Sequence, residues 1–199
     1  MGDVLHLSSG RLAPRALGER MNGTSSVLFD LGVHDADLAC WLSGRDIARV
    51  YARAVRKRLV SAGVDSEDAI FTTCELEGGA VAQLHAGWTL PDDAPAPVNA
   101  RTMVVGAQGT IEIDVRDHGL RVHDADGYRQ PDALHWPSTG GRRGGDLVEQ
   151  LRHFVGAIAR DEPFRVGVDD ALRAVAVNDA ILRSVASGRP EDVEPWSIA

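Results

Sequence analysis

The sequence predicts an α+β fold: an open, predominantly antiparallel sheet with helices packed on one face. Several short segments in the middle of the chain show strand patterns, and glycine-containing turns separate some of them. Strands joined by short turns pair antiparallel. One helical pattern precedes this run and two follow it, an order typical of α+β proteins. A chain of 199 residues suits a single domain.

The chain begins with an expected strand over Asp3 to Leu12, where apolar and polar residues mix without helical periodicity. A helix is expected next, from Val27 to Ser43. Ser25 or Ser26 can cap its first turn by accepting backbone N–H bonds, and Gly44 suits its C-terminal end.

Five strands are expected after this helix. Residues 69–76 show the clearest alternation, which fits a sheet with two unlike faces. Glycines in Glu77-Gly78-Gly79 and in Gly106 to Gly109 predict hairpin turns. The expected strands are Ile47 to Arg58, Ala69 to Leu76, Ala80 to Trp88, Arg101 to Val105 and Thr110 to Val115.

The region Gly119 to Gly145 is rich in glycine, proline and polar residues. It contains two short strand-like pieces, Leu120 to His123 and Ala133 to Trp136. Two amphipathic helical patterns close the chain, at Asp146 to Ala159 and at Val168 to Ser187.

Composition excludes several classes of protein. The formal net charge of −8 repels phosphate backbones, so nucleic acid is not an expected partner. No apolar stretch approaches the roughly 20 residues that a membrane-spanning helix needs. The two cysteines, Cys40 and Cys74, lack metal-ligand spacing, and no secretory signal is present. We therefore expect a cytoplasmic protein.

Asp30, His34 and Asp37 recur at helical spacing, so they would share one helix face with Trp41. His34 is the side chain that titrates nearest neutrality, and a carboxylate one turn away can orient its ring, as a general base requires. One imidazole and two carboxylates could instead hold a metal ion. The third possibility is an ordinary helix-start carboxylate, a hydrogen-bonded histidine and a solvated aspartate.

Three stretches of the chain form a recognisable set: Gly2-Asp3-Val4, Asp30 to Asp37 followed by Trp41, Leu42 and Gly44, and Val105-Gly106 to Gly109-Thr110-Ile111-Glu112. Together they resemble the second, C-terminal domain of the Gfo/Idh/MocA family of NAD(P)-dependent oxidoreductases. The closing segments around Phe154 to Pro163 and Asp169 to Ser184 are similar to the tail of that domain.

The resemblance implies the fold of a dihydrodipicolinate-reductase-like C-terminal domain over residues 1–199. It also implies a catalytic pair in which His34 accepts a proton from a substrate hydroxyl and Asp30 orients the substrate or the base. Asp37, His85 and Trp88 are the expected substrate contacts, with His85 reaching a pocket if its strand face meets the first helix. No metal site is assigned.

The resemblance further implies NAD or NADP as cofactor, but we do not expect either to bind this chain alone. The Rossmann domain that holds the cofactor in the family is absent from residues 1–199, and Lys57, expected within a strand, does not match the family's active-site lysine. The chain would therefore be inactive alone, as a fragment or truncated form.

The resulting hypothesis is the substrate-binding and oligomerisation domain of an oxidoreductase that acts on a CH–OH group of a sugar or polyol. Its expected partners are the small-molecule substrate, further copies of itself through the open sheet face, and a separate Rossmann chain. Two alternatives stay open: a non-catalytic oligomerisation or interaction module, and a metal-dependent hydrolase.

Overall fold

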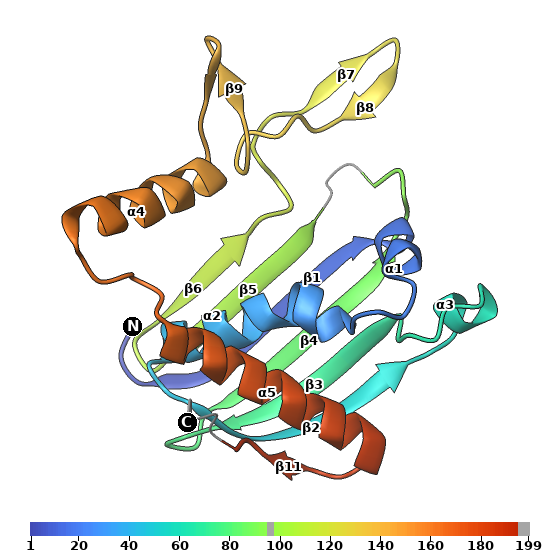
Figure 1. The fold of residues 1–199 in the computed structure, drawn as a ribbon, viewed down its shortest axis with the longest axis vertical. Helices are drawn as coiled ribbons and strands as arrows, with labels where there is room; N and C mark the ends of the chain where they lie inside the picture. Colours follow the sequence, from blue (N-terminus) through green and yellow to red (C-terminus); the bar gives the residue numbers. More distant parts are fainter. Residues whose placement is uncertain (95–97, 195–199) are drawn as a thin grey trace.

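A computed structural model describes residues 1–94 and 98–194. It confirms the predicted fold class, because a seven-stranded, mostly antiparallel open sheet carries helices on one face (Figure 1). The strands of this sheet are β1 (Val4–Pro14), β2 (Ile47–Val55), β3 (Ala69–Leu76), β4 (Val81–Leu90), β5 (Asn99–Gly106), β6 (Gly109–Asp114) and β11 (Glu191–Asp192). The helices are α1 (Arg15–Met21), the π-helical turn η1 (Leu28–Gly32), α2 (Val33–Ser43), α3 (Arg58–Ser61), α4 (Asp146–Arg160) and α5 (Val168–Ser187).

The order of strands across the sheet differs from their order along the chain. It runs β11-β2-β3-β4-β1-β5-β6, so the first strand inserts between the fourth and the fifth. Strand β1 pairs parallel with β4 and antiparallel with β5. The pairs β2–β3, β3–β4 and β5–β6 are antiparallel, and the last two are hairpins closed by the predicted glycine turns.

Helices α2 and α5 cover one face of the sheet (Figure 1). Along β3, Ile70, Thr72 and Cys74 are buried, while Phe71 and Thr73 are exposed on the opposite face. Burial therefore alternates with the side-chain period of a strand, as predicted. The main core lies between the sheet and these two helices.

Residues 115–167 form an arm that projects from the sheet (Figure 1). The arm holds two small hairpins and α4. The sheet with α1, η1, α2, α3 and α5 is called the body. The hairpins are β7 (Val122–Asp124) with β8 (Gly127–Arg129), and β9 (Ser138–Thr139) with β10 (Arg142–Arg143).

Several local predictions need correction. The helix predicted from Val27 begins as a π-helical turn, and its start is held by Glu67, whose carboxylate accepts the backbone N–H of Val27 at 2.8 Å. The strand predicted to end at Arg58 ends at Val55, which places Lys57 between β2 and α3.

The strand-like piece predicted at Ala133 to Trp136 is a bend rather than a strand. The carboxylate of Asp132 accepts backbone N–H bonds from Leu134, His135 and Trp136, and these local bonds bend the chain. The other predicted piece, Leu120 to His123, is displaced to β7.

Candidate active site

A hollow of about 530 Å³ lies where β1, α1, η1 and α2 meet. Four side chains with polar chemistry line it: Arg11 from β1, Arg20 from α1, Asp30 from η1 and His34 from α2. The remaining lining residues are apolar. The structure thus brings together the two residues that the sequence predicts as a catalytic pair.

Asp30 is held from behind by a buried indole. The Nε1–H of Trp88 donates to Oδ2 of Asp30 at 2.9 Å, and the Trp88 side chain is 1% exposed. Asn178 of α5 donates to the carbonyl of Leu28 at 2.9 Å, which ties the turn that carries Asp30 to the core. Isolated π-helical turns are frequent at functional sites.

His34 lies in the first turn of α2, at the edge of the hollow. Burial lowers the pKa of its imidazole below the ordinary value, and the positive charge of Arg11 lowers it further, against smaller opposing effects of nearby aspartates. The ring is therefore neutral at pH 7 and can accept a proton from a bound hydroxyl.

Asp35, the neighbour of His34, is the centre of a buried polar network that the sequence analysis did not identify. Ser9 Oγ donates to Oδ1 of Asp35 at 2.6 Å and lies 2.6 Å from Oγ1 of Thr102. Arg11 Nε donates to Oδ2 of Asp35 at 3.4 Å. Burial raises the pKa of the Asp35 carboxyl. No local pattern signals this network, because it joins β1, β5 and α2.

Trp88, a predicted substrate contact, lies behind Asp30. The two remaining predicted contacts lie away from the hollow. Asp37 is half-buried on α2, where burial and the negative charge of Asp170 raise the pKa of its carboxyl. His85 alternates with the buried residues of β4 and so points to the open face, where its ring stacks on Phe71 at 5.5 Å.

Metal binding receives no support from this geometry. In the part of the chain that the structure describes, no three His, Cys, Asp or Glu side chains are grouped so that they could hold a metal ion. Asp30, His34 and Asp37 therefore do not form a ligand set.

The glycine turn between β5 and β6 is not a phosphate-binding loop. Gly106 and Gly109 belong to the hairpin between β5 and β6. A phosphate-binding glycine loop would instead join a strand to a helix N-terminus.

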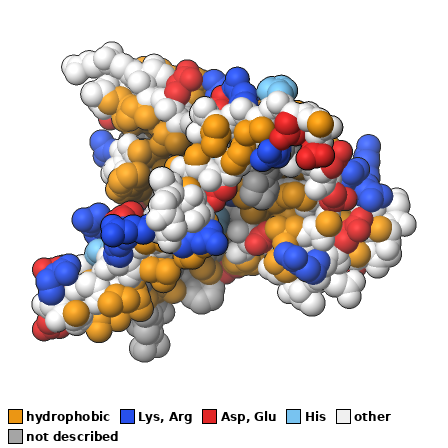
Figure 2. Space-filling view, turned by 90° about the horizontal axis from the view of Figure 1, so that it is seen from above, with side chains coloured by type: hydrophobic (Ala, Val, Ile, Leu, Met, Phe, Trp, Pro, Cys, Tyr) orange, Lys and Arg blue, Asp and Glu red, His pale blue; other side chains and the backbone are white. Residues whose placement is uncertain are grey.

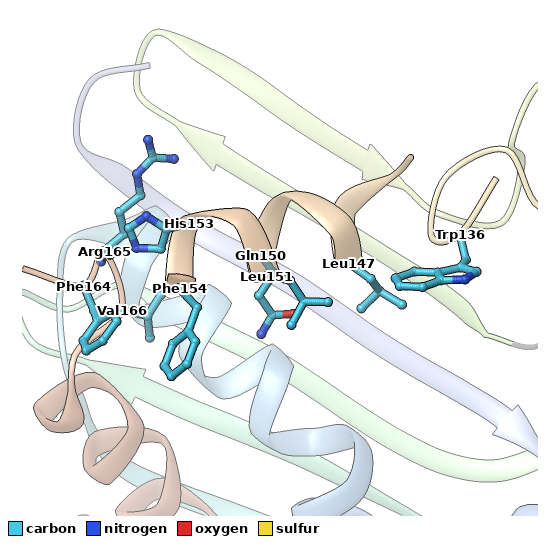
Figure 3. A pocket seen from close by; sticks show the side chains of 9 residues that line it. All are labelled: Trp136, Leu147, Gln150, Leu151, His153, Phe154, Phe164, Arg165 and Val166. Carbon is cyan, nitrogen blue, oxygen red and sulfur yellow. Dashed lines mark hydrogen bonds between the residues drawn. The ribbon is translucent and has the colours of Figure 1, made fainter. Parts of the chain in front are cut away.

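A second hollow, of about 520 Å³, lies along α4 in the arm (Figure 3). Leu147, Leu151 and Phe154 line it from α4, and the ring of Phe164 stacks on Phe154 at 5.3 Å. Figure 2 views the molecule from above and shows apolar side chains at the surface beside charged groups of both signs. Among its described lining residues this hollow has no carboxylate, so it lacks the proton-transfer pair of the first.

The Gfo/Idh/MocA C-terminal domain matches residues 1–112. The chain belongs to this family of NAD(P)-dependent oxidoreductases, as its sequence predicts.

Inositol 2-dehydrogenase of Rhizobium meliloti (strain 1021) is 25% identical over 171 residues, which are 83% of this chain and 49% of that protein. Myo-inositol 2-dehydrogenase from Lactobacillus plantarum has a TM-score of 0.75 and 18% identity, over 97% of this chain and 57% of that one. Scyllo-inositol dehydrogenase from Lactobacillus casei, solved with NAD(H) and scyllo-inositol, has a TM-score of 0.75 and 18% identity, over 96% and 57%. The chain thus spans about half the length of these relatives.

Proposed function

We propose that this chain is the substrate-binding and oligomerisation part of an NAD(P)-dependent oxidoreductase that acts on a CH–OH group of a sugar or polyol. One observation carries the proposal: in a member of this family, Asp30 and His34 line the same hollow. The names of the three relatives described above, which are inositol dehydrogenases, support a polyol as the substrate class.

His34 is the proposed proton acceptor. Its lowered pKa keeps the imidazole neutral, and a neutral ring nitrogen can take the proton of a substrate hydroxyl as the C–H bond is broken. The reaction also needs a hydride acceptor. Because the family is NAD(P)-dependent, we propose NAD or NADP as this acceptor, held by a Rossmann domain.

Asp30 is proposed to orient the hydroxyl by accepting a hydrogen bond from it. The indole N–H of Trp88 donates to Oδ2 of Asp30, and no other hydrogen bond to this carboxylate comes from the described residues. Oδ1 can therefore accept a hydrogen bond from the substrate. Trp88 would then act through Asp30, as a positioning residue. Substrate contact by Asp37 or His85 stays a prediction, as does a cytoplasmic location.

Complementation tests this assignment. The chain is mixed with the separately expressed Rossmann domain of a Gfo/Idh/MocA dehydrogenase, NAD and myo-inositol, and formation of NADH is followed by absorbance. We expect His34→Ala to lower the rate by about 10²–10⁴-fold, the usual contribution of a general base. The matched control is His153→Ala, in the hollow of the arm, which leaves the rate unchanged.

A partner that binds wild type and His34→Ala equally well, without NADH formation in either, would favour the non-catalytic module. The open sheet face is the observation behind that second candidate. Tyr51, Phe71 and Val81 are exposed on it, and no described helix covers it. We propose that it also makes the contacts between copies of the oxidoreductase.

Light scattering after gel filtration tests the oligomer. Phe71→Asp places a charge on the open face and is expected to reduce the mass to that of one chain, because an uncompensated buried charge is costly at an interface. Phe154→Asp, at a similarly exposed aromatic ring on the arm, is the control and leaves the mass unchanged. The opposite pattern would assign the contact to the arm.

A further inference from the structure

We propose that the hollow around His34 binds an anionic polyol, whose carboxylate or phosphate group is held by Arg11 and Arg20. The inference rests on the proposed function, since it takes this hollow as the substrate site. It narrows the substrate class from polyols in general to sugar acids or sugar phosphates.

The guanidinium of Arg11 is held in place at the wall of the hollow by a buried carboxylate. Its Nε donates to Asp35, a carboxylate that is 1% exposed and is also bonded to Ser9. This contact uses one edge of the guanidinium. The two terminal nitrogens have no carboxylate within 4 Å among the described residues, so they stay free to donate to a ligand.

Arg20 lines the same hollow from the last turn of α1. Within residues 1–94 and 98–194 it has no acidic group within 4 Å, although the chain carries more acidic than basic side chains. The adjacent Glu19 forms an ion pair with Arg58 instead, with 3.1 Å between Oε1 of Glu19 and a terminal guanidinium nitrogen of Arg58. The positive charge of Arg20 is therefore available to the hollow.

The guanidinium donors in the lining favour an anion over a neutral sugar. Two guanidinium groups face the hollow, and Asp30 is its single lining carboxylate among the described residues. Asp35 pairs with Nε of Arg11 from behind the lining, which leaves the terminal nitrogens of Arg11 to a ligand. Asp30 is held by Trp88 and is placed beside His34, where the reacting hydroxyl would lie. Guanidinium groups bind carboxylate and phosphate oxygens through parallel N–H donors, which a neutral hydroxyl cannot match.

The size of the hollow agrees with such a ligand. A volume of about 530 Å³ lies within the usual range for small-molecule sites and accommodates a six-carbon sugar with one anionic substituent. One hydroxyl can then lie against Asp30 and His34 while the anionic end reaches the arginines.

NMR titration of the full 199-residue chain tests the inference. Shifts of the His34 ring are followed with D-glucose, D-glucuronate and D-glucose 6-phosphate at low salt. We expect at least one anionic sugar to bind about tenfold more tightly than glucose, as a charged hydrogen bond would give. The glucuronate and phosphate arms tell which anion is preferred.

Arg20→Gln is expected to weaken binding of the anionic sugar more than binding of glucose, and so to remove this preference. Arg152→Gln is the control, because Arg152 lies on α4 and pairs with Glu149. Arg11→Gln alone would leave Asp35 buried without its cation, so the double variant Arg11→Gln/Asp35→Asn tests the first arginine. It is also expected to lose the preference for the anion.

Equal Kd values for glucose and both anions would overturn the anion inference and leave the proposed role of His34 intact. A loss of glucose and glucuronate binding to the same extent in Arg20→Gln would overturn it as well. If none of the three sugars shifts the His34 ring, both the inference and the proposed substrate site are overturned.

Discussion

Large apolar side chains are buried in the body and exposed in the arm. In the body, Trp88, Ile70 and Val177 are almost completely buried between the sheet and its helices. In the arm, Phe154 is 52% exposed and Ile158 is 60% exposed, although α4 has the stronger amphipathic pattern of the two C-terminal helices. An amphipathic pattern therefore predicts that a helix has an apolar face, and does not predict which surface covers it.

This contrast has a consequence for stability. Burial of apolar area stabilises the fold, so the free energy of unfolding resides in the body. The arm, whose apolar side chains stay in water, adds little to it.

Trp88→Ala should reduce the free energy of unfolding by about 3–5 kcal/mol, the usual cost of emptying a buried aromatic site. Phe154→Ala removes an aromatic ring from the arm and should stay within about 0.5 kcal/mol of wild type. Urea denaturation followed by circular dichroism measures both. A comparable loss in the two variants would show that the arm is part of the cooperative core.

Asp35→Ala should cost about 1–3 kcal/mol, because it leaves Ser9 and Arg11 without their buried acceptor. The control is Asp124→Ala in the arm, which breaks an exposed ion pair with Arg129 and should cost at most about 1 kcal/mol. Denaturation midpoints of the two variants give the comparison. A larger loss for Asp124→Ala would reverse the roles of body and arm.

The pKa of His34 should lie below the ordinary value of 6.5. The unfolded chain then binds more protons than the folded chain near this pH, so His34 makes the protein less stable as pH falls below about 6.5. NMR titration of the ring gives the midpoint. Arg11→Gln should raise it, whereas Arg129→Gln in the arm should not, and a midpoint above 6.5 in wild type would contradict the prediction.

The thiol of Cys74 should not react with thiol reagents while the body is folded. Its thiol is buried on β3, and burial raises its pKa to about 12. A thiol-specific reagent at pH 8 should label it only after unfolding. The comparison is Ser138→Cys, at an exposed position of the arm, where the new thiol should react within the mixing time. Rapid labelling of Cys74 would show that the body opens locally.

Most of the secondary structure was predictable because it depends on near neighbours along the chain. The alternation in β3 and the turn at Gly78 and Gly79 predict a hairpin, and both partners form it. The limits of α5 agree with the predicted helix, Val168 to Ser187. The insertion of β1 between β4 and β5 was not predictable, since its partners lie more than 70 residues away.

One part of the candidate site was also predictable from near neighbours along the chain, and the other part was not. Asp30 and His34 are close in sequence, and helical spacing alone is enough to place them together. Arg11 and Trp88 meet them, and Asp35 meets Ser9 and Arg11, only because β1 lies beside β4 and α2 packs on both. Even the helix that carries the pair starts with a π-helical turn that spacing did not predict.

The sequence by itself thus determined the fold class, through local periodicity and spacing, and its family resemblance predicted Asp30 and His34 as an acid–base pair. Only the tertiary structure decided that Trp88 holds Asp30, that Arg11 and Arg20 share the hollow with His34, and that the apolar face of α4 stays exposed. The physical reason is that these contacts join segments brought together by strand order. Strand order is set by the packing of the whole chain.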